Sequence, residues 1–181
     1  MFAAPRRIRP GRGCGVRDRG ATKIRRKTAR KGKGSVRVQY GALPYRFTPE
    51  AALEILILTT RRTRRWIVPK GWPIKGLRPP KAAAREAFEE AGVTGRIGVK
   101  PVGSFTYDKA LDEEGHEVSC EVTVYPLLVK RQAKTWPEFD ERLTQWVEPG
   151  RAAAMVADHE LKTLIAAFAK RVAAVASNLS V

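Results

Sequence analysis

The chain is best interpreted from one stretch, residues 85–93, which reads Arg-Glu-Ala-Phe-Glu-Glu-Ala-Gly-Val. This stretch closes a run of good helix formers over 81–91, in which Ala, Glu, Lys and Arg dominate. Pro80 is well tolerated at the first position of a helix, and Gly92 is typical of a helix end. The sequence therefore predicts a helix over 81–91.

Three carboxylates of this helix share one face. Glu86, Glu89 and Glu90 stand at i, i+3 and i+4, so their side chains project from the same side. Like charges at these spacings destabilise a helix by roughly 0.2–0.5 kcal/mol per pair, and Arg85 can neutralise only part of that repulsion. A hard divalent cation such as Mg²⁺ would offset it, because it prefers carboxylate oxygens. An acidic, solvated surface is the alternative interpretation, and spacing alone does not separate the two.

The rest of the chain predicts what this helix packs on. Its opposite side is apolar and mostly small, with Ala84, Ala87, Phe88 and Ala91. Apolar or alternating segments predict strands at 36–40, 51–60, 66–68, 97–107, 118–129 and 143–147. Apolar residues from Leu161 to Val175 recur at helical spacing and predict a C-terminal helix. Strands and helices interleave without strict alternation, so we expect an α/β fold with a mixed sheet flanked by helices.

A fixed spacing links the acidic helix to the loop before it. Gly71 lies fourteen residues before Arg85, and the stretch from Gly71 to Val93 resembles the Nudix box, G-x5-E-x7-R-E-U-x-E-E-x-G-U, where U is apolar. One position departs from the box, since Leu77 stands where the first Glu is found. The resemblance covers roughly residues 36–170 and implies a Nudix-type α/β/α sandwich.

The resemblance also implies a metal site. Nudix enzymes cleave a diphosphate linkage with Mg²⁺ or Mn²⁺ and an activated water. By position in the box, Glu86 and Glu90 are the implied metal ligands, and the backbone carbonyl of Lys70 beside Gly71 completes the metal shell. Bound metal neutralises phosphate charge and lowers the pKa of its water.

Two further box residues take catalytic roles by the same resemblance. Glu89 is the implied general base or a ligand to a water-activating ion, since the assignment varies across the family. Arg85 is expected to orient the carboxylates. Leu77 replaces a Glu that is mainly a supporting residue in the family, so its presence bears on loop geometry and rate more than on metal binding.

The approach to the box carries information on the substrate. Thr-Thr-Arg at 59–61 and Arg-Trp-Ile-Val-Pro-Lys-Gly at 65–71 resemble the diphosphoinositol polyphosphate phosphohydrolase branch. Arg binds phosphate through paired hydrogen bonds, so a group of basic residues beside the metal site suits a phosphate-rich small molecule. A diphosphoinositol polyphosphate and a dinucleoside polyphosphate both fit. The residues expected to bind substrate are Thr59, Thr60, Arg61, Arg65 and Lys70.

Other side chains remain open from the sequence. Trp72 or Tyr107 could provide the flat platform that an adenine base requires. Glu121 could supply an additional carboxylate, whereas a solvated position is the better interpretation for Glu117.

The net charge of +17 is concentrated at one end of the chain. Residues 1–37 contain fourteen Lys or Arg and one acid. We expect 1–35 to be a basic tail, disordered on its own, 36–177 to form the hydrolase domain and 178–181 to be its C-terminal end. The tail could attract RNA, act as a targeting leader or be a solvated extension. The alternative function is accordingly an RNA-binding module or an RNA 5′-end pyrophosphohydrolase.

Composition excludes several classes of protein. No apolar run approaches the roughly 18 residues of a membrane span. The two Cys and two His are too few for a disulfide framework or a zinc finger. We expect a cytoplasmic enzyme without a membrane partner, and the oligomeric state stays open.

Overall fold

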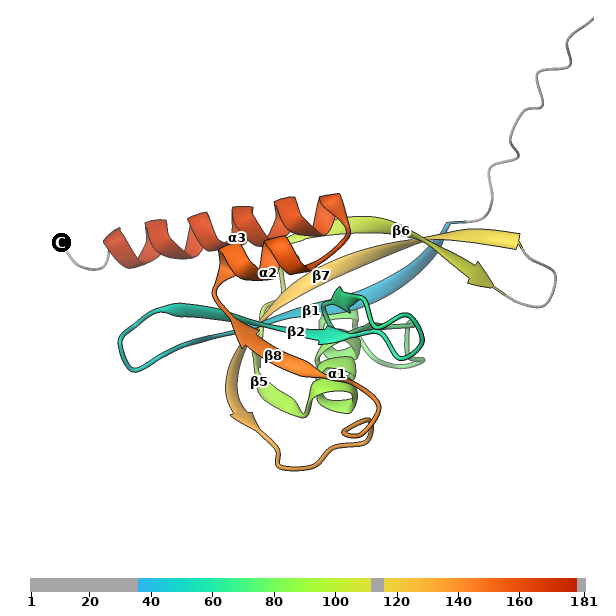
Figure 1. Cartoon of the computed structure of the whole chain (residues 1–181), viewed down its shortest axis with the longest axis horizontal. Helices are drawn as coiled ribbons and strands as arrows, with labels where there is room; N and C mark the ends of the chain where they lie inside the picture. Colours follow the sequence, from blue (N-terminus) through green and yellow to red (C-terminus); the bar gives the residue numbers. More distant parts are fainter. Residues whose placement is uncertain (1–35, 112–115, 179–181) are drawn as a thin grey trace, which may run out of the picture. The chain divides into compact units, whose positions relative to one another are not determined.

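The computed structural model describes residues 36–111 and 116–178, and these form a mixed sheet with helices on both faces (Figure 1). The expected tail 1–35, the loop 112–115 and the end 179–181 lie outside the described residues. The strands are β1 (Arg37–Phe47), β2 (Leu53–Thr59), β3 (Trp66–Ile67), β4 (Lys70–Gly71), β5 (Val93–Ile97), β6 (Gly103–Leu111), β7 (His116–Gln132) and β8 (Thr144–Val147). The helices are α1 (Pro79–Ala91), α2 (Pro149–Met155) and α3 (His159–Asn178).

Two long strands carry the sheet. β1 and β7 run parallel at its centre, from Arg37 opposite Cys120 to Tyr45 opposite Leu128. The remaining pairs are antiparallel: β2 and β4 flank β1, β5 and β6 flank β7, and β3 and β8 extend β2. The mixed sheet expected from the sequence is therefore confirmed.

Each face of the sheet has its own apolar core, because successive residues of a strand point to opposite faces. Ile55 and Ile57 of β2 face α2 and α3, whereas Leu56 and Leu58 face α1. In Figure 1 α2 and α3 lie on one side of the sheet and α1 on the other. This arrangement confirms the α/β/α sandwich.

Helix α1 lies close to the sheet because the residues between them are small. Ala83, Ala87 and Ala91 are fully buried against β1 and β2. Phe88 was expected on this face, but it is 38% exposed, since it falls to the side of the alanine stripe. The stripe brings the backbone of α1, and the glutamates on its flank, next to β4.

The end of α1 is fixed by Gly92 and by an aromatic ring. Gly92 has the left-handed conformation, with φ of 69°, and its N–H donates to the carbonyls of Ala87 and Phe88. A Cβ at this position would lie 2.4 Å from the ring of Trp136. The indole therefore packs on the glycine and anchors the loop 133–143 to the helix end.

The structure differs from the expected elements in several places: strands β4 and β5 were not predicted, and β1 extends beyond the expected 36–40. The strand expected at 97–107 is wrong, because β5 ends at Ile97 and β6 begins at Gly103; Gly98 and Pro101 interrupt the apolar run between them. Helix α2 was not predicted. The carboxylate of Glu148 caps it by accepting from the Arg151 N–H at 2.8 Å, with Pro in the first turn.

Candidate active site

Lys70 presents its backbone to α1. Tyr40 lies opposite Gly71, and the Ala42 N–H donates to the Pro69 carbonyl, so Lys70 falls between the hydrogen-bonded pairs of β1 and β4. Its amide and carbonyl therefore point away from β1. The amide donates to Oε2 of Glu90 at 3.0 Å. The Lys70 carbonyl is directed to the same edge, where an ion could use it.

Glu86 packs directly on the backbone of β4. A Cβ at Gly71 would lie 2.0 Å from the Cδ of Glu86, so only glycine leaves room for this carboxylate. Burial raises the pKa of Glu86, and the charges of Glu89 and Glu138 raise it further, against Lys70 and Arg142. Within the described residues the Glu86 carboxylate has no hydrogen bond or ion pair. Its negative charge is thus not held by a direct contact with any described residue.

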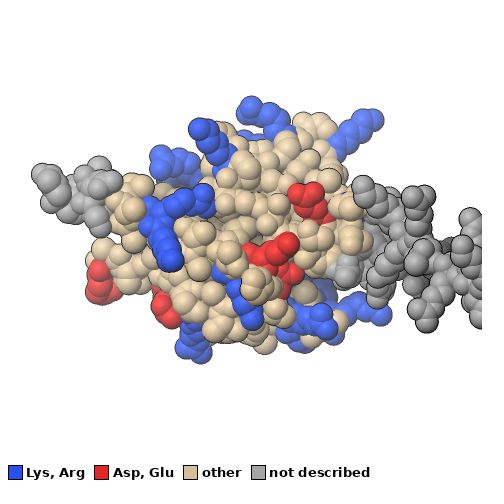
Figure 2. Space-filling model, turned by 90° about the horizontal axis from the view of Figure 1, so that it is seen from above, with Lys and Arg blue, Asp and Glu red and all other residues tan. Residues whose placement is uncertain are grey.

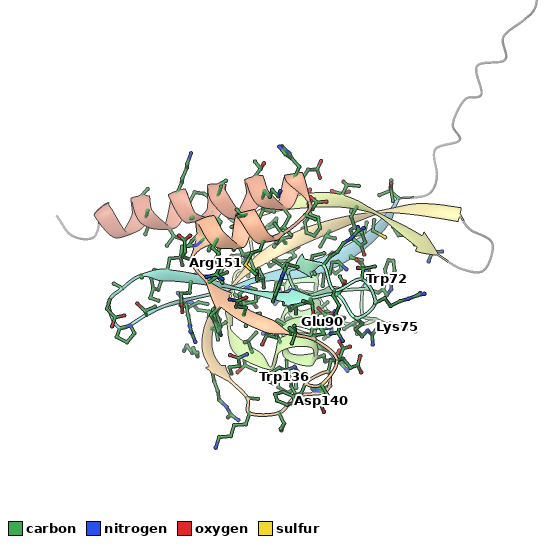
Figure 3. The ribbon with its side chains drawn as sticks, in the orientation of Figure 1. Trp72, Lys75, Glu90, Trp136, Asp140 and Arg151 are labelled. Atoms are coloured by element: carbon green, nitrogen blue, oxygen red, sulfur yellow. The ribbon has the colours of Figure 1, made fainter. Side chains whose placement is uncertain are left out.

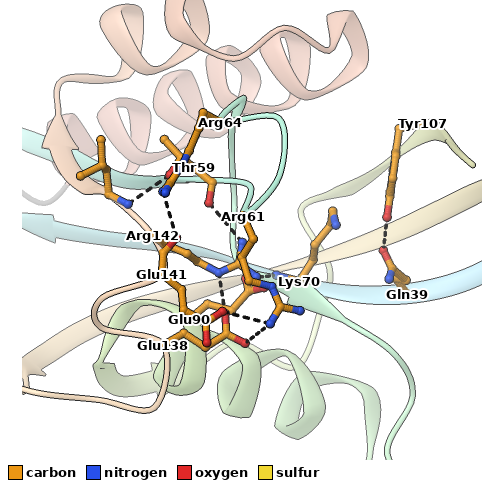
Figure 4. Close-up of polar contacts among 11 residues, drawn as sticks. Gln39, Thr59, Arg61, Arg64, Lys70, Glu90, Tyr107, Glu138, Glu141 and Arg142 are labelled. Carbon is orange, nitrogen blue, oxygen red and sulfur yellow. Dashed lines mark hydrogen bonds and ion pairs between the residues drawn. The ribbon is translucent and has the colours of Figure 1, made fainter.

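Glu90 is the most buried of the three glutamates. It is 7% exposed, and its Oε1 accepts from Nη2 of Arg142 at 2.5 Å. Burial raises the pKa of Glu90 to about 7, although the Arg142 guanidinium and the Lys70 amide both act to lower it. Charged groups at this depth require such partners. Glu90 is therefore held by two chain segments besides its own (Figure 4).

Glu89 lies at the open side of the acidic face. Its Oε1 accepts from Nε of Arg85 at 2.7 Å, in the orienting role expected for that arginine. Among the described residues no three side chains of His, Cys, Asp or Glu are grouped as a metal site. Glu89 and Glu90 each face a guanidinium, that of Arg85 and that of Arg142 respectively. A cation bound between Glu86 and either neighbour would replace one of these contacts.

The residues present nevertheless fit a hard cation. The unpartnered Glu86 carboxylate, the Glu90 carboxylate and the Lys70 carbonyl are all oxygen donors at one edge of α1. Oxygen donors of this kind are the ones that Mg²⁺ and Mn²⁺ prefer.

The two threonines expected to bind substrate are engaged within the protein. Thr59 is 2% exposed; its Oγ1 accepts from the Leu143 N–H and its carbonyl from Nη1 of Arg142, each at 3.1 Å. Oγ1 of Thr60 bonds Oγ1 of Thr63 at 2.8 Å and accepts from the Arg65 N–H. Both hydroxyls therefore shape the turn that follows β2.

The basic residues near this turn differ in whether their charges are already paired within the protein. Arg61 pairs with Glu141 at 3.1 Å and with Glu138 at 3.7 Å, so it is already neutralised. The side chain of Arg65 is exposed and, within the part of the chain that the structure describes, makes no ion pair. Nζ of Lys70 lies 4.6 Å from the centre of the Tyr107 ring. Arg65 is thus the more available anion contact of the two arginines.

The structure describes both candidates for the aromatic platform, Tyr107 and Trp72, and one of the two candidate carboxylates, Glu121. The hydroxyl of Tyr107 donates to Oε1 of Gln39 at 2.7 Å, while Trp72 is 36% exposed in the loop that also carries Lys75 (Figure 3). Glu121 is half-buried on β7 opposite Val38. The side chain of Glu117 lies outside the described residues.

The loop 133–143 supplies residues that the sequence did not identify. Nε of Arg142 donates to Oε2 of Glu138 at 2.6 Å, and the Glu138 N–H donates to the Glu89 carbonyl. Nη1 of Arg64 donates to the carbonyl of Glu141. The sequence predicted a strand over 143–147 and gave no indication of a contact between Arg142 and Glu90.

Gly71→Ala tests the packing of Glu86. The new Cβ would displace the carboxylate, so we expect about 10- to 100-fold slower turnover with little loss of stability. Steady-state hydrolysis and thermal unfolding measure the two effects. Gly76→Ala is the control: its Cβ meets nothing within 4 Å, while its φ of 83° costs about 1 kcal/mol of stability. Equal activity losses in both variants would contradict the packing argument.

Comparison with known proteins identifies the family of the chain. Residues 40–168 match the NUDIX domain. The chain belongs to the Nudix family. It is 31% identical to Nudix hydrolase 21, chloroplastic, of Arabidopsis thaliana over 135 residues, which is 72% of this chain and 65% of that protein. It is 34% identical to diphosphoinositol polyphosphate phosphohydrolase 3-beta of Bos taurus over 93 residues, about half of each chain.

Solved structures agree on the fold. A C. elegans Ap4A hydrolase complex superposes with a TM-score of 0.58 at 23% identity, over 77% of this chain and 99% of that one. The chain spans a little under two thirds of the first curated relatives that it matches. Relatives carry chloroplastic or mitochondrial in their names, so the expected cytoplasmic location stays a prediction. No helix among the described residues is long and apolar enough to cross a bilayer.

Proposed function

We propose that the chain is a Mg²⁺- or Mn²⁺-dependent pyrophosphohydrolase that cleaves a phosphoanhydride bond in a phosphate-rich substrate. The observation that carries this proposal is the Glu86 carboxylate, which packs on Gly71 beside the Lys70 carbonyl and has no partner among the described residues. Family membership supports it, because the matched residues 40–168 include the whole acidic helix.

Some residues of the site are proposed to bind the ion and another to accept a proton. Glu86, Glu90 and the Lys70 carbonyl would hold the cation, which when bound neutralises phosphate charge and acidifies its water. Glu89 is the proposed general base, because its side chain is partly exposed whereas that of Glu90 is buried. Arg85 keeps it oriented through the 2.7 Å contact.

We further propose that the substrate is a diphosphoinositol polyphosphate or a dinucleoside polyphosphate. Lys70 provides positive charge beside the acidic face, and Arg65 is an exposed cation in the segment between β2 and β3. Arg61 becomes available if its pairs with Glu138 and Glu141 open. The name of the Bos taurus relative supports the first substrate class. A dinucleotide additionally needs an aromatic platform, for which Trp72 is the exposed candidate.

A second candidate is hydrolysis at the 5′ end of RNA, with the charge of the tail as its support. Residues 1–35 contain thirteen Lys or Arg against one Asp. Such a segment attracts polyanions with a strong dependence on salt.

A substrate panel tests both candidates. Release of product is measured for each substrate with Mg²⁺ and with EDTA: phosphate from a diphosphoinositol polyphosphate, mononucleotides from a dinucleoside polyphosphate, and phosphate or pyrophosphate from a 5′-triphosphate RNA. We expect release from one of the first two that stops in EDTA. Release from the RNA alone would establish the second candidate. No release from any substrate, or release that persists in EDTA, would contradict the proposed enzyme.

A further inference from the structure

A hollow lies at the end of β1 that is remote from Lys70. It is an open groove of about 530 Å³ between the end of β1, the segment that joins β5 to β6, and the second half of α3. Along β1 its wall at Phe47 is six residues beyond Gly41, which pairs with Lys70. At about 3.3 Å per residue this separation is roughly 20 Å. The groove is therefore separate from the proposed active site.

The lining of the groove is largely apolar. Tyr45 and Phe168 form its floor, with ring centres 5.0 Å apart in an edge-to-face arrangement. Phe47 and Val175 stand on its walls, 47% and 60% exposed. Large exposed apolar side chains that line one concave surface mark binding sites in soluble proteins. This groove offers a surface for an apolar body.

The rim of the groove carries charge of a single sign. Arg96, Lys100 and Arg171 line it, and among the described residues no Asp or Glu does. Arg96 and Lys100 have no ion pair within the described residues, and Nη2 of Arg171 donates to the carbonyl of Val102 at 3.0 Å. Figure 2 shows Lys and Arg side chains gathered beside the end of α3. The rim is therefore complementary to an anion.

We propose that this groove binds a small anionic amphiphile, meaning an acyl or aromatic body that carries a carboxylate, phosphate or sulfonate group. The groove volume falls in the range of small-molecule sites, which combine an apolar lining with a few convergent polar groups. The apolar body lies on Tyr45, Phe47 and Phe168, and the anionic group meets the cationic rim. The chain's own segment 1–35 is not a fitting occupant, because its charge has the same sign as the rim.

Fluorescence of 8-anilinonaphthalene-1-sulfonate on the full chain tests the proposal. We expect saturable binding that laurate displaces and that dodecyltrimethylammonium, a cation with the same alkyl length, does not. The double variant R96E/K100E should weaken binding by about tenfold or more. The control is K134E/R151E, which has the same net charge, changes two exposed residues outside the groove and should bind like the parent.

Three results would overturn the proposal. These are equal weakening in both double variants, displacement by the cationic amphiphile as readily as by laurate, and saturable binding of an acidic amphipathic peptide that laurate does not compete with. The last result would assign the groove to a protein partner. Unchanged thermal unfolding midpoints in both double variants confirm that any difference is local. Because substrate hydrolysis is not the readout, the result is independent of the proposed enzyme activity.

Discussion

Replacement of Glu89 by Gln is expected to lower the rate of phosphoanhydride hydrolysis by about 10²- to 10⁴-fold, the range that loss of a general base produces. Gln keeps the size of Glu89 but cannot accept the proton. The folded state should be nearly unchanged, because the lost contact is an exposed i,i+4 pair with Arg85, worth about 0.3–0.5 kcal/mol. Measured kcat for the substrate identified by the panel and a thermal unfolding curve give the two quantities.

Glu54→Gln is a matched control for this variant. Nε of Arg46 contacts Oε2 of Glu54 at 2.7 Å, the same distance as between Arg85 and Glu89, in a partly exposed cross-strand pair away from the acidic face. The control should hydrolyse substrate at the parental rate. A Glu89→Gln variant that is as active as Glu54→Gln would remove the proposed base.

Arg142→Met is expected to lower the free energy of unfolding by about 3–5 kcal/mol, the cost of leaving a buried charge without its partner. The Arg142 side chain is 8% exposed and contacts Glu90, Glu138 and the Thr59 carbonyl. Methionine fills a similar volume but bonds none of them. Urea unfolding of the parent and the variant measures the difference.

Two further variants isolate the cause. Arg85→Met breaks an exposed i,i+4 pair instead of a buried one and should cost under about 1 kcal/mol. Glu90→Gln combined with Arg142→Met removes the buried charge and should recover part of the lost stability. If Arg142→Met costs no more than Arg85→Met, the buried pair does not support the fold.

The acidic helix could be predicted because its determinants are local. Helix period alone places Glu86, Glu89 and Glu90 on one face, and α1 has the expected end at Gly92. The fixed spacing between Gly71 and Arg85 also linked the helix to a residue outside it. The structure supplies its physical reason, since the Glu86 carboxylate occupies the place of a side chain at position 71.

The partners of these glutamates could not be predicted, because they come from distant segments. Arg142 is 52 residues from Glu90, and nothing in either local sequence indicates the contact. Thr59 shows the converse case. The resemblance of 59–61 to the diphosphoinositol polyphosphate phosphohydrolase branch predicted substrate binding by Thr59. Its hydroxyl accepts from the Leu143 N–H, a partner that only the folded chain reveals.

The three-part support of Glu90 also has a consequence for biosynthesis. Lys70, Glu90 and Arg142 enter the growing polypeptide in that order, and the contacts that hold the carboxylate require all three. A nascent chain that has emerged only to the end of β7 already contains every box residue but lacks the guanidinium. The native support of the Glu90 carboxylate therefore forms late in translation, after the ribosome has released the segment that carries Arg142.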